Sequence, residues 1–261
     1  MGFWDHLEVL RGHIFRSAAA LLVFSIIAFI FKEIIFDGII LAPLDAHFIT
    51  NRILCRLGHW VSSESLCFQK LELVLQNIEL SGQFMMHLYV SFVAGLILAM
   101  PYIIFEIWRF ILPALHENEK KYTRGAVFVI SVLFLSGVFF GYFLIVPLTI
   151  NFFGNYHVSE QVTNQIHLNS YISSVISIVM GIGIVFELPV LIYFLTKVGV
   201  VTPAFLKKNR KVMVVIVLVL ASIITPPDVF SQILVSIPLL LLYELSIKVA
   251  NKVYKSNFYN V

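Results

Sequence analysis

Glu187 is the residue of this chain whose type and position most directly suggest chemistry. It lies in Val185-Phe186-Glu187-Leu188-Pro189, inside a long apolar stretch. An acidic side chain at the centre of a membrane-spanning helix costs about 2.5–3.5 kcal/mol, so such a group normally faces a bundle interior or a wet cavity. Glu187 is therefore an intramembrane polar site, either a substrate contact or protonatable group, or a helix–helix hydrogen bond. Pro189 favours a kink that opens a cavity beside it.

Two segments combine carboxylates with aromatic and aliphatic residues at the ends of apolar stretches. They are Phe3–Arg11, which contains Glu8, and Leu112–Lys121, which contains Glu119. Carboxylates pair well with guanidinium groups while apolar neighbours contact the flank of a peptide, so these segments suit a cationic, partly apolar peptide. Interfacial anchoring with helix capping is the alternative.

Motifs for enzymatic chemistry are missing from the sequence. It contains no His-Glu-x-x-His, no Gly-x-Ser-x-Gly, no phosphate-binding glycine loop and no Cys/His set with zinc spacing. His6 and His13 lie on one helical face, but a pair without a third ligand indicates surface imidazoles rather than a metal site. Glu106 and Glu244, near the ends of apolar stretches, are expected to be solvated. We predict no catalytic residue, no cofactor and no metal site.

The overall composition is that of a membrane protein. The 261 residues are 59% hydrophobic and 13% charged, with a mean hydropathy of +0.93. An average soluble domain has about 25% charged residues. A disordered chain and a nucleic-acid binder are excluded, since both would carry a higher charge density.

Apolar stretches of about 20 residues are long enough to cross a bilayer as helices. Four stretches qualify, and a further block, Val212–Ile247, is interrupted by Thr225-Pro226-Pro227-Asp228. Prolines disfavour helix at this point, so the block is interpreted as two helices. The predicted fold is an all-α, polytopic membrane protein with one domain over residues 1–261 and six spans, at about 14–36, 84–108, 126–153, 171–197, 212–224 and 229–247.

Lys and Arg alternate between the two sides of these spans. Odd-numbered segments outside the spans carry 14 of the 18 basic residues, and even-numbered segments carry 3. Because basic residues accumulate in cytoplasmic loops, both termini are expected in the cytoplasm.

Residues 37–83 are then expected to form an exterior loop on the oxidising side. Cys55 and Cys67 in this loop are either bridged or two unrelated thiols. Apolar residues at positions 71, 74, 75 and 78 predict an amphipathic helix that lies on the membrane surface.

Five segments, in order along the chain, match one known family. They are Asp5-His6-Leu7-Glu8-x-Leu10-Arg11, Ala42-Pro43-Leu44, Trp108-x-Phe110-x-x-Pro113-Ala114-Leu115 followed by Glu119, Phe186-Glu187-x-Pro189, and Thr225-Pro226-Pro227-Asp228-Val229-Phe230-Ser231-Gln232. On these segments the chain resembles the TatC subunit of the twin-arginine protein translocase over nearly its whole length. The resemblance implies a concave, glove-like bundle of six helices, of which the fifth and sixth are short.

The resemblance also implies a function. It predicts the membrane core and signal-peptide receptor of a system in the bacterial cytoplasmic membrane that exports folded proteins bearing a twin-arginine signal peptide, driven by the proton gradient. Such a protein is not an enzyme. The implied partners are these signal peptides, single-span subunits of the TatA and TatB type, and further copies of the chain in a multimeric receptor complex.

The residues that bind the signal peptide are carried over from the family by position. The resemblance implies a set made of Glu119, Phe110, Leu115, Arg11 and Glu8. Glu119 is expected to be the main contact of the paired arginines. Glu8 departs from the family pattern His-Leu-x-Glu-Leu-Arg, because Val9 occupies the acidic position and a shift of one residue turns a helical side chain by about 100°.

Two further sites follow from the same resemblance. Glu187 is expected on the concave side of the bundle. Gln232, with Thr225 and Asp228, is expected to dock the single-span partners, although the Gln232 amide could instead bond to helix neighbours. A small proton-coupled solute transporter that titrates Glu187 is the alternative function, but the sequence lacks paired broken helices and a complementary cation within a span.

Overall fold

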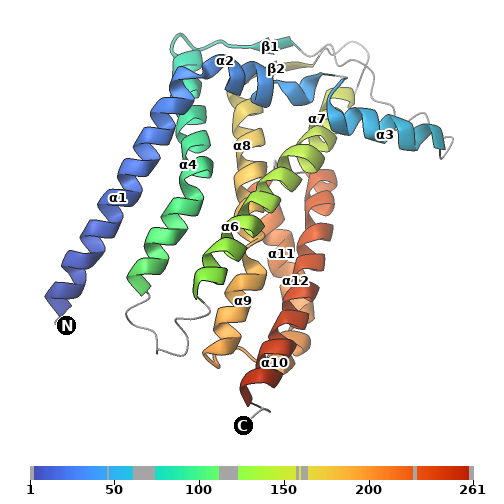
Figure 1. Ribbon diagram of the computed structural model, residues 1–261. Coiled ribbons are helices and arrows are strands. Elements are labelled where there is room, and N and C mark those ends of the chain that lie inside the picture. The colour runs from blue at the N-terminus through green and yellow to red at the C-terminus, as the bar shows by residue number, and fades with distance from the viewer. Residues whose placement is uncertain are drawn as a thin grey trace. The chain divides into compact units, whose positions relative to one another are not determined.

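Helices make up almost all of the structure (Figure 1). The computed structural model describes residues 3–45, 47–60, 74–111, 123–156, 159, 164–225 and 228–258. Within these residues five helical segments are long and apolar enough to cross a membrane: Leu7–Ile30, Gly82–Ile111, Gly125–Asn155, Leu168–Lys197 and Val229–Lys255. The predicted class, an all-α polytopic membrane protein, is confirmed.

Contacts divide the chain into two compact units. The first comprises Met1–Phe48, Gln69–Leu135 and His157–Ile176, and the second Ile49–Phe68, Ser136–Tyr156 and Ser177–Val261. Helices α6 (Thr123–Phe140) and α8 (Leu168–Val185) contribute residues to both units. The single domain over residues 1–261 stays a prediction.

The first unit is built on two long helices, α1 (Phe3–Ile30) and α4 (Gly82–Ile111), which pack along each other (Figure 1). Near one end, the His87 ring stacks on Phe29 with centroids 4.0 Å apart, and His87 Nε2 donates to the Phe29 carbonyl at 3.1 Å. In the middle, Gly95 lies so close to Ser25 that a Cβ atom would come within 2.7 Å of the Ser25 Cα. The missing side chain of Gly95 therefore permits this close helix packing.

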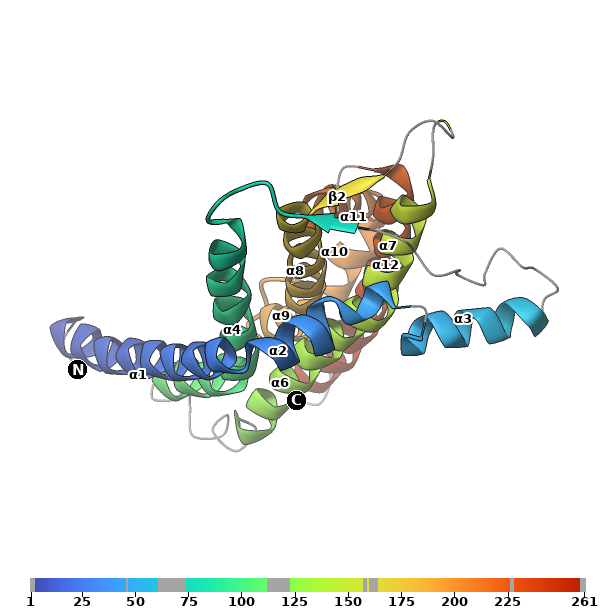
Figure 2. The same cartoon turned by 90° about the horizontal axis from the view of Figure 1, so that it is seen from above.

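A cap of short elements covers one end of this helix pair. It contains α2 (Lys32–Ile35), a π-helical turn (Phe36–Ile40), a 3₁₀ turn (Ala42–Leu44), and strands β1 (Val74–Gln76) and β2 (Gln165–His167). The strands pair in parallel (Figure 2). The predicted amphipathic helix is therefore wrong at residues 74–76, where the backbone forms its hydrogen bonds with β2 instead of within a helix.

The second unit is organised around α12 (Val229–Phe258). This helix packs against α9 (Leu188–Lys197), α10 (Pro203–Lys208) and α11 (Arg210–Ile224). A buried cluster of Ile192, Leu206, Tyr243, Ile247 and Ala250 joins α9, α10 and α12. Within it, Tyr243 Oη donates to the Leu206 carbonyl at 2.8 Å, so the phenol is satisfied without water.

Helix α3 (Ile49–Trp60) is anchored by a hydrogen bond from Thr50 to the Phe143 carbonyl. A π-helical turn, Gly141–Ile145, precedes α7 (Val146–Asn155), and Pro147 in its first turn has no N–H to donate to the Phe143 carbonyl four residues earlier. The Thr50 hydroxyl donates to that carbonyl instead. The bond gives a partly buried carbonyl a donor and attaches α3 to this helix.

The last two helices differ in how well the sequence predicted them. Helix α11 has 15 residues, which at 1.5 Å per residue is about 22 Å and shorter than a bilayer core. A short fifth helix was expected here, and the full count of six spans in a concave bundle stays a prediction. Helix α12 is longer than predicted, with 30 residues that continue past position 247 to Phe258. Lys is a good helix former, so the basic end remains helical beyond the apolar part.

Candidate functional site

A buried carboxylate lies between α1 and α4, near the start of one helix and the end of the other. The Glu106 side chain on α4 is only 1% exposed, and His13 Nδ1 on α1 donates to its Oε2 atom at 2.5 Å. Arg16 Nη1 lies 3.6 Å from the same oxygen, and Arg109 Nη1 lies 3.7 Å from Oε1. We call these four residues the Glu106 cluster.

The cluster offsets the free-energy cost of burying the Glu106 carboxylate. A buried, unpaired carboxylate would neutralise rather than remain charged, whereas nearby cations and hydrogen-bond donors stabilise the ionised form. His13 and Arg16 come from α1, so the cluster also holds that helix against α4. Both expectations from the sequence are wrong here: Glu106 is not solvated, and His13 is not a surface imidazole but 13% exposed. Only the Glu106–Arg109 spacing, i to i+3, could have signalled the cluster.

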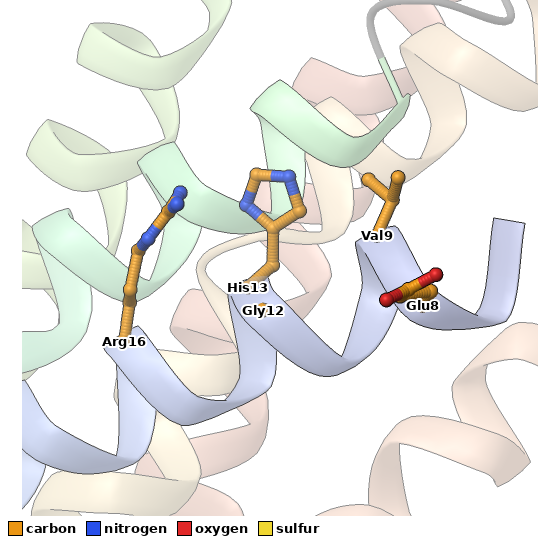
Figure 3. A pocket seen from close by; sticks show the side chains of 5 residues that line it. All are labelled: Glu8, Val9, Gly12, His13 and Arg16. Carbon is orange, nitrogen blue, oxygen red and sulfur yellow. The ribbon is translucent and has the colours of Figure 1, made fainter. Parts of the chain in front are cut away.

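The amino-terminal segment continues from this cluster as the first turns of α1. A hollow of about 400 Å³ is lined by Glu8, Val9, Gly12, His13 and Arg16. Figure 3 shows Val9, His13 and Arg16 projecting to one side of α1 and Glu8 to a different side. The family's acidic position, occupied by Val9, therefore faces the same side as the cluster, and the Glu8 carboxylate does not.

Three of the five residues predicted to bind the signal peptide lie in the part of the chain that the structure describes. Phe110 lies beside the cluster, with its ring centroid 6.1 Å from that of His13. Arg11 is exposed, and its Cζ atom lies 5.4 Å from the centroid of the Phe15 ring. Glu8 is also exposed. Glu119 and Leu115 lie outside the described residues, so their roles stay predictions.

Glu187 belongs to the second unit and lies at a break between α8 and α9. Helix α8 ends at Val185 and α9 begins at Leu188, so Phe186 and Glu187 form the step between them. Pro189, in the first turn of α9, cannot donate to the Val185 carbonyl, which accounts for the break. The predicted kink is confirmed, and the Glu187 side chain is half-buried. Its chemical role stays a prediction.

The predicted docking residues form hydrogen bonds within their own helix end or to the neighbouring helix. Gln232 Nε2 donates to the Leu218 carbonyl of α11 at 3.0 Å. Asp228 Oδ1 accepts from the Ser231 backbone N–H at 2.6 Å and so caps the start of α12. The Thr225 hydroxyl donates to the Ala221 carbonyl at 2.9 Å. These bonds stabilise the α11–α12 hairpin, and docking of partners stays a prediction.

Three remaining expectations concern Glu244, the cysteines and metals. Glu244 is solvated as predicted, 47% exposed and paired with Arg210 at 2.8 Å. Cys55 is disulfide-bonded, and Cys67 lies outside the described residues. Across the described part of the chain, no group of three or more His, Cys, Asp or Glu side chains could hold a metal ion.

Five membrane-length helices and a charge cluster at the ends of two of them define a helical multi-pass membrane protein. Residues 5–238 match the family model described as Sec-independent protein translocase protein (TatC). The chain belongs to the TatC family, and the resemblance inferred from its motifs is confirmed.

Two related proteins match this chain over nearly its full length. The chain is 42% identical over 257 residues to the Sec-independent protein translocase protein TatC of Blattabacterium sp. subsp. Periplaneta americana, covering 98% of this chain and 97% of the relative. It is 34% identical over 262 residues to TatC of Carboxydothermus hydrogenoformans, covering 99% and 96%.

Solved structures support the same fold. A crystal structure of the twin arginine translocase receptor TatC is 32% identical, with a TM-score of 0.72 over 95% of this chain and 99% of that one. A second, of the same receptor in DDM, is 33% identical, with a TM-score of 0.75 over 94% and 99%.

Proposed function

We propose that this chain is the membrane core and signal-peptide receptor of a twin-arginine translocase. The observation that carries the proposal is the likeness, over 95% of the chain, to a crystal structure of a twin arginine translocase receptor. The family name describes Sec-independent protein translocation, which is transport rather than catalysis. The proton gradient is the proposed energy source.

The proposed binding surface for the signal peptide combines the amino-terminal turns of α1 with the segment that follows α4. Glu119 receives an arginine of the peptide, and Phe110 and Leu115 contact its apolar flank. Phe110 packs beside His13, so the Glu106 cluster fixes the start of this surface. Arg11 and Glu8 line its α1 side, where Glu8 contributes less because it points away from the face of Val9.

The proposed topology places this surface in the cytoplasm. Basic residues favour a cytoplasmic location of both termini and of the segment after α4. The protein then resides in the bacterial cytoplasmic membrane, where twin-arginine precursors arrive from the cytoplasm. The proposed partners are single-span subunits of the TatA and TatB type, docked at the α11–α12 hairpin around Gln232, Thr225 and Asp228, and further copies of the chain.

A peptide-binding assay tests the receptor role. A synthetic signal peptide with Arg-Arg should retain the purified full chain, and the same peptide with Lys-Lys should retain much less. Charge-assisted hydrogen bonds are worth about 1.5–3 kcal/mol each, so Glu119→Ala should weaken Arg-Arg binding about tenfold or more. Glu244→Ala is the control, because Glu244 is an exposed acid paired with Arg210 and remote in sequence.

Transport in cells gives an independent test of the same assignment. Glu119→Lys should abolish export of a twin-arginine reporter, because a cation at this position repels the arginines. Export at the wild-type level would overturn the role of Glu119. Equal retention by the Arg-Arg and Lys-Lys peptides would overturn the receptor role altogether.

A further inference from the structure

We propose that Arg16 and Arg109 form a binding site for the phosphodiester of an anionic phospholipid, at the end of the α1–α4 pair where Glu106 is buried. The site goes beyond the proposed receptor function and does not depend on it. Its occupant is a lipid of the surrounding membrane, recognised by its headgroup phosphate and by its acyl chain.

The Glu106 cluster has a net positive charge. Two arginines share one carboxylate, and their Nη1 atoms lie 3.6 and 3.7 Å from it, beyond the usual 2.7–3.2 Å of a hydrogen bond. The closest contact to Glu106 comes from His13. Each guanidinium has five N–H donors. The arginines therefore keep donors for a second anion.

These donors are accessible from outside the helix pair. The Arg16 side chain is 55% exposed and the Arg109 side chain 51% exposed, whereas Glu106 is 1% exposed. The carboxylate thus lies beneath the two guanidinium groups and holds them near each other. A phosphate that approaches from the membrane meets the cations before the carboxylate, and bidentate pairing with phosphate suits the planar guanidinium.

The charge pattern of the two helices places both arginines at the expected edge of the hydrocarbon core. On α1, the 15 residues 17–31 after Arg16 carry no charge, and on α4 the residues 83–105 before Glu106 carry none. The uncharged stretches indicate where the hydrocarbon core lies, and the arginines mark its edge on both helices. Basic side chains in this position reach to the headgroup layer, and basic pockets between membrane helices bind anionic headgroups.

Apolar surface continues from the arginines along the same helices. Only 6% of the apolar window of α1 is buried. Phe15 is 62% exposed and Phe105 44% exposed, and the Arg109 Cζ atom lies 5.6 Å from the Phe105 ring centroid. An acyl chain would cover these side chains while its phosphate meets the guanidinium groups.

The pair of exposed arginines next to apolar surface favours a lipid over free inorganic phosphate. A free phosphate would leave the apolar surface uncovered. It would also carry more negative charge than the single charge of a phosphodiester. The structure therefore commits the site to a singly charged phosphodiester attached to acyl chains.

Native mass spectrometry of the purified full chain in detergent tests the proposal. The probes are phosphatidylglycerol, phosphatidylcholine and inorganic phosphate, each titrated separately. The test variant is Arg16→Gln/Arg109→Gln, and Arg16→Lys/Arg109→Lys keeps the charges. Arg210→Gln is the matched control, since Arg210 is 52% exposed but neutralised one-to-one by Glu244 at 2.8 Å. Thermal unfolding of every variant is measured alongside.

Wild type is expected to bind phosphatidylglycerol about 25-fold more tightly than phosphatidylcholine, with about fivefold contributed by each arginine. The glutamine double variant should lose this preference, and the lysine variant and Arg210→Gln should keep it. The proposal is overturned if wild type shows no preference, if Arg210→Gln loses as much as the double variant, or if inorganic phosphate displaces phosphatidylglycerol. If the glutamine double variant does not fold, each single variant must lose about fivefold, and unchanged binding by both would overturn the site.

Discussion

His13 Nδ1 and Glu106 Oε2 lie 2.5 Å apart, although 93 residues separate them in the chain. The bond joins the beginning of α1 to the end of α4. Residues proposed to bind the signal peptide flank both sides of it: Glu8 and Arg11 precede His13, and Phe110 follows Glu106. The bond therefore sets how the α1 part of the proposed receptor surface is placed relative to Phe110 at the end of α4.

Removal of the Glu106 charge should destabilise the protein. Glu106→Gln removes the buried anion beside His13 and two half-exposed arginines, and a hydrogen bond to a charged group contributes about 1.5–3 kcal/mol. The matched control is Glu244→Gln, which removes an exposed pair worth about 0–1 kcal/mol. We expect a clearly lower midpoint of thermal unfolding in detergent for Glu106→Gln only. Equal midpoints for the two variants would contradict the structural role of the cluster.

A methyl group at Gly95 should separate α1 from α4. The Cβ of Gly95→Ala would come within 2.6 Å of the Ser25 backbone nitrogen, so backbone rather than a flexible side chain must move. Overpacking of this kind costs about 1–3 kcal/mol or more. In Gly12→Ala on α1 the new Cβ meets nothing within 4 Å, and helix propensity should add about 0.5–1 kcal/mol of stability. The midpoint of thermal unfolding should therefore fall for Gly95→Ala and rise for Gly12→Ala. A lower midpoint for Gly12→Ala would argue against the arrangement of α1 and α4 described above.

An acid restored at position 9 should strengthen peptide binding. Val9 projects to the same side of α1 as His13 and Arg16, whereas Glu8 does not (Figure 3). One added charge-assisted contact is worth about 1.5–3 kcal/mol, so Val9→Glu should raise the affinity for an Arg-Arg peptide about tenfold. Glu8→Gln should change the affinity less. The assignment of this helix face fails if Val9→Glu binds the Arg-Arg and Lys-Lys peptides equally.

The second cysteine should be the partner of Cys55. Cys55 is disulfide-bonded, and Cys67, twelve residues later, is the other cysteine of the chain. Cys67→Ser should therefore expose one thiol to a maleimide under non-reducing, denaturing conditions, where wild type exposes none. Closing a loop of this length stabilises by about 3 kcal/mol in the chain-entropy model. Labelling of wild type without a reductant would disprove the bridge.

Sequence reasoning succeeded where a property is local. The long apolar stretches predicted the membrane-spanning helices, because each helix satisfies its own backbone hydrogen bonds in hydrocarbon. Pro189 predicted the break at Glu187, because a proline removes one particular donor. The motif segments predicted the TatC family, since their residues and order are read directly from the chain.

The same reasoning failed where a residue depends on a distant partner. Apolar side chains at positions 71, 74, 75 and 78 have a helical spacing, but residues 74–76 pair as a strand with Gln165–His167. Glu106 and Glu244 are both acids near the ends of apolar stretches, yet one is buried and the other solvated. Local spacing carries no information about which helix lies alongside.

The sequence by itself determined that this chain is a helical membrane protein of the TatC family, because hydropathy, prolines and motifs act within short stretches. Only the tertiary structure decided which charges neutralise each other. Glu106 remains acceptable in a buried position because α1 brings His13 and Arg16 to it across 93 and 90 residues. Such pairing is a property of helix packing, and packing depends on the whole surface of both helices rather than on either segment alone.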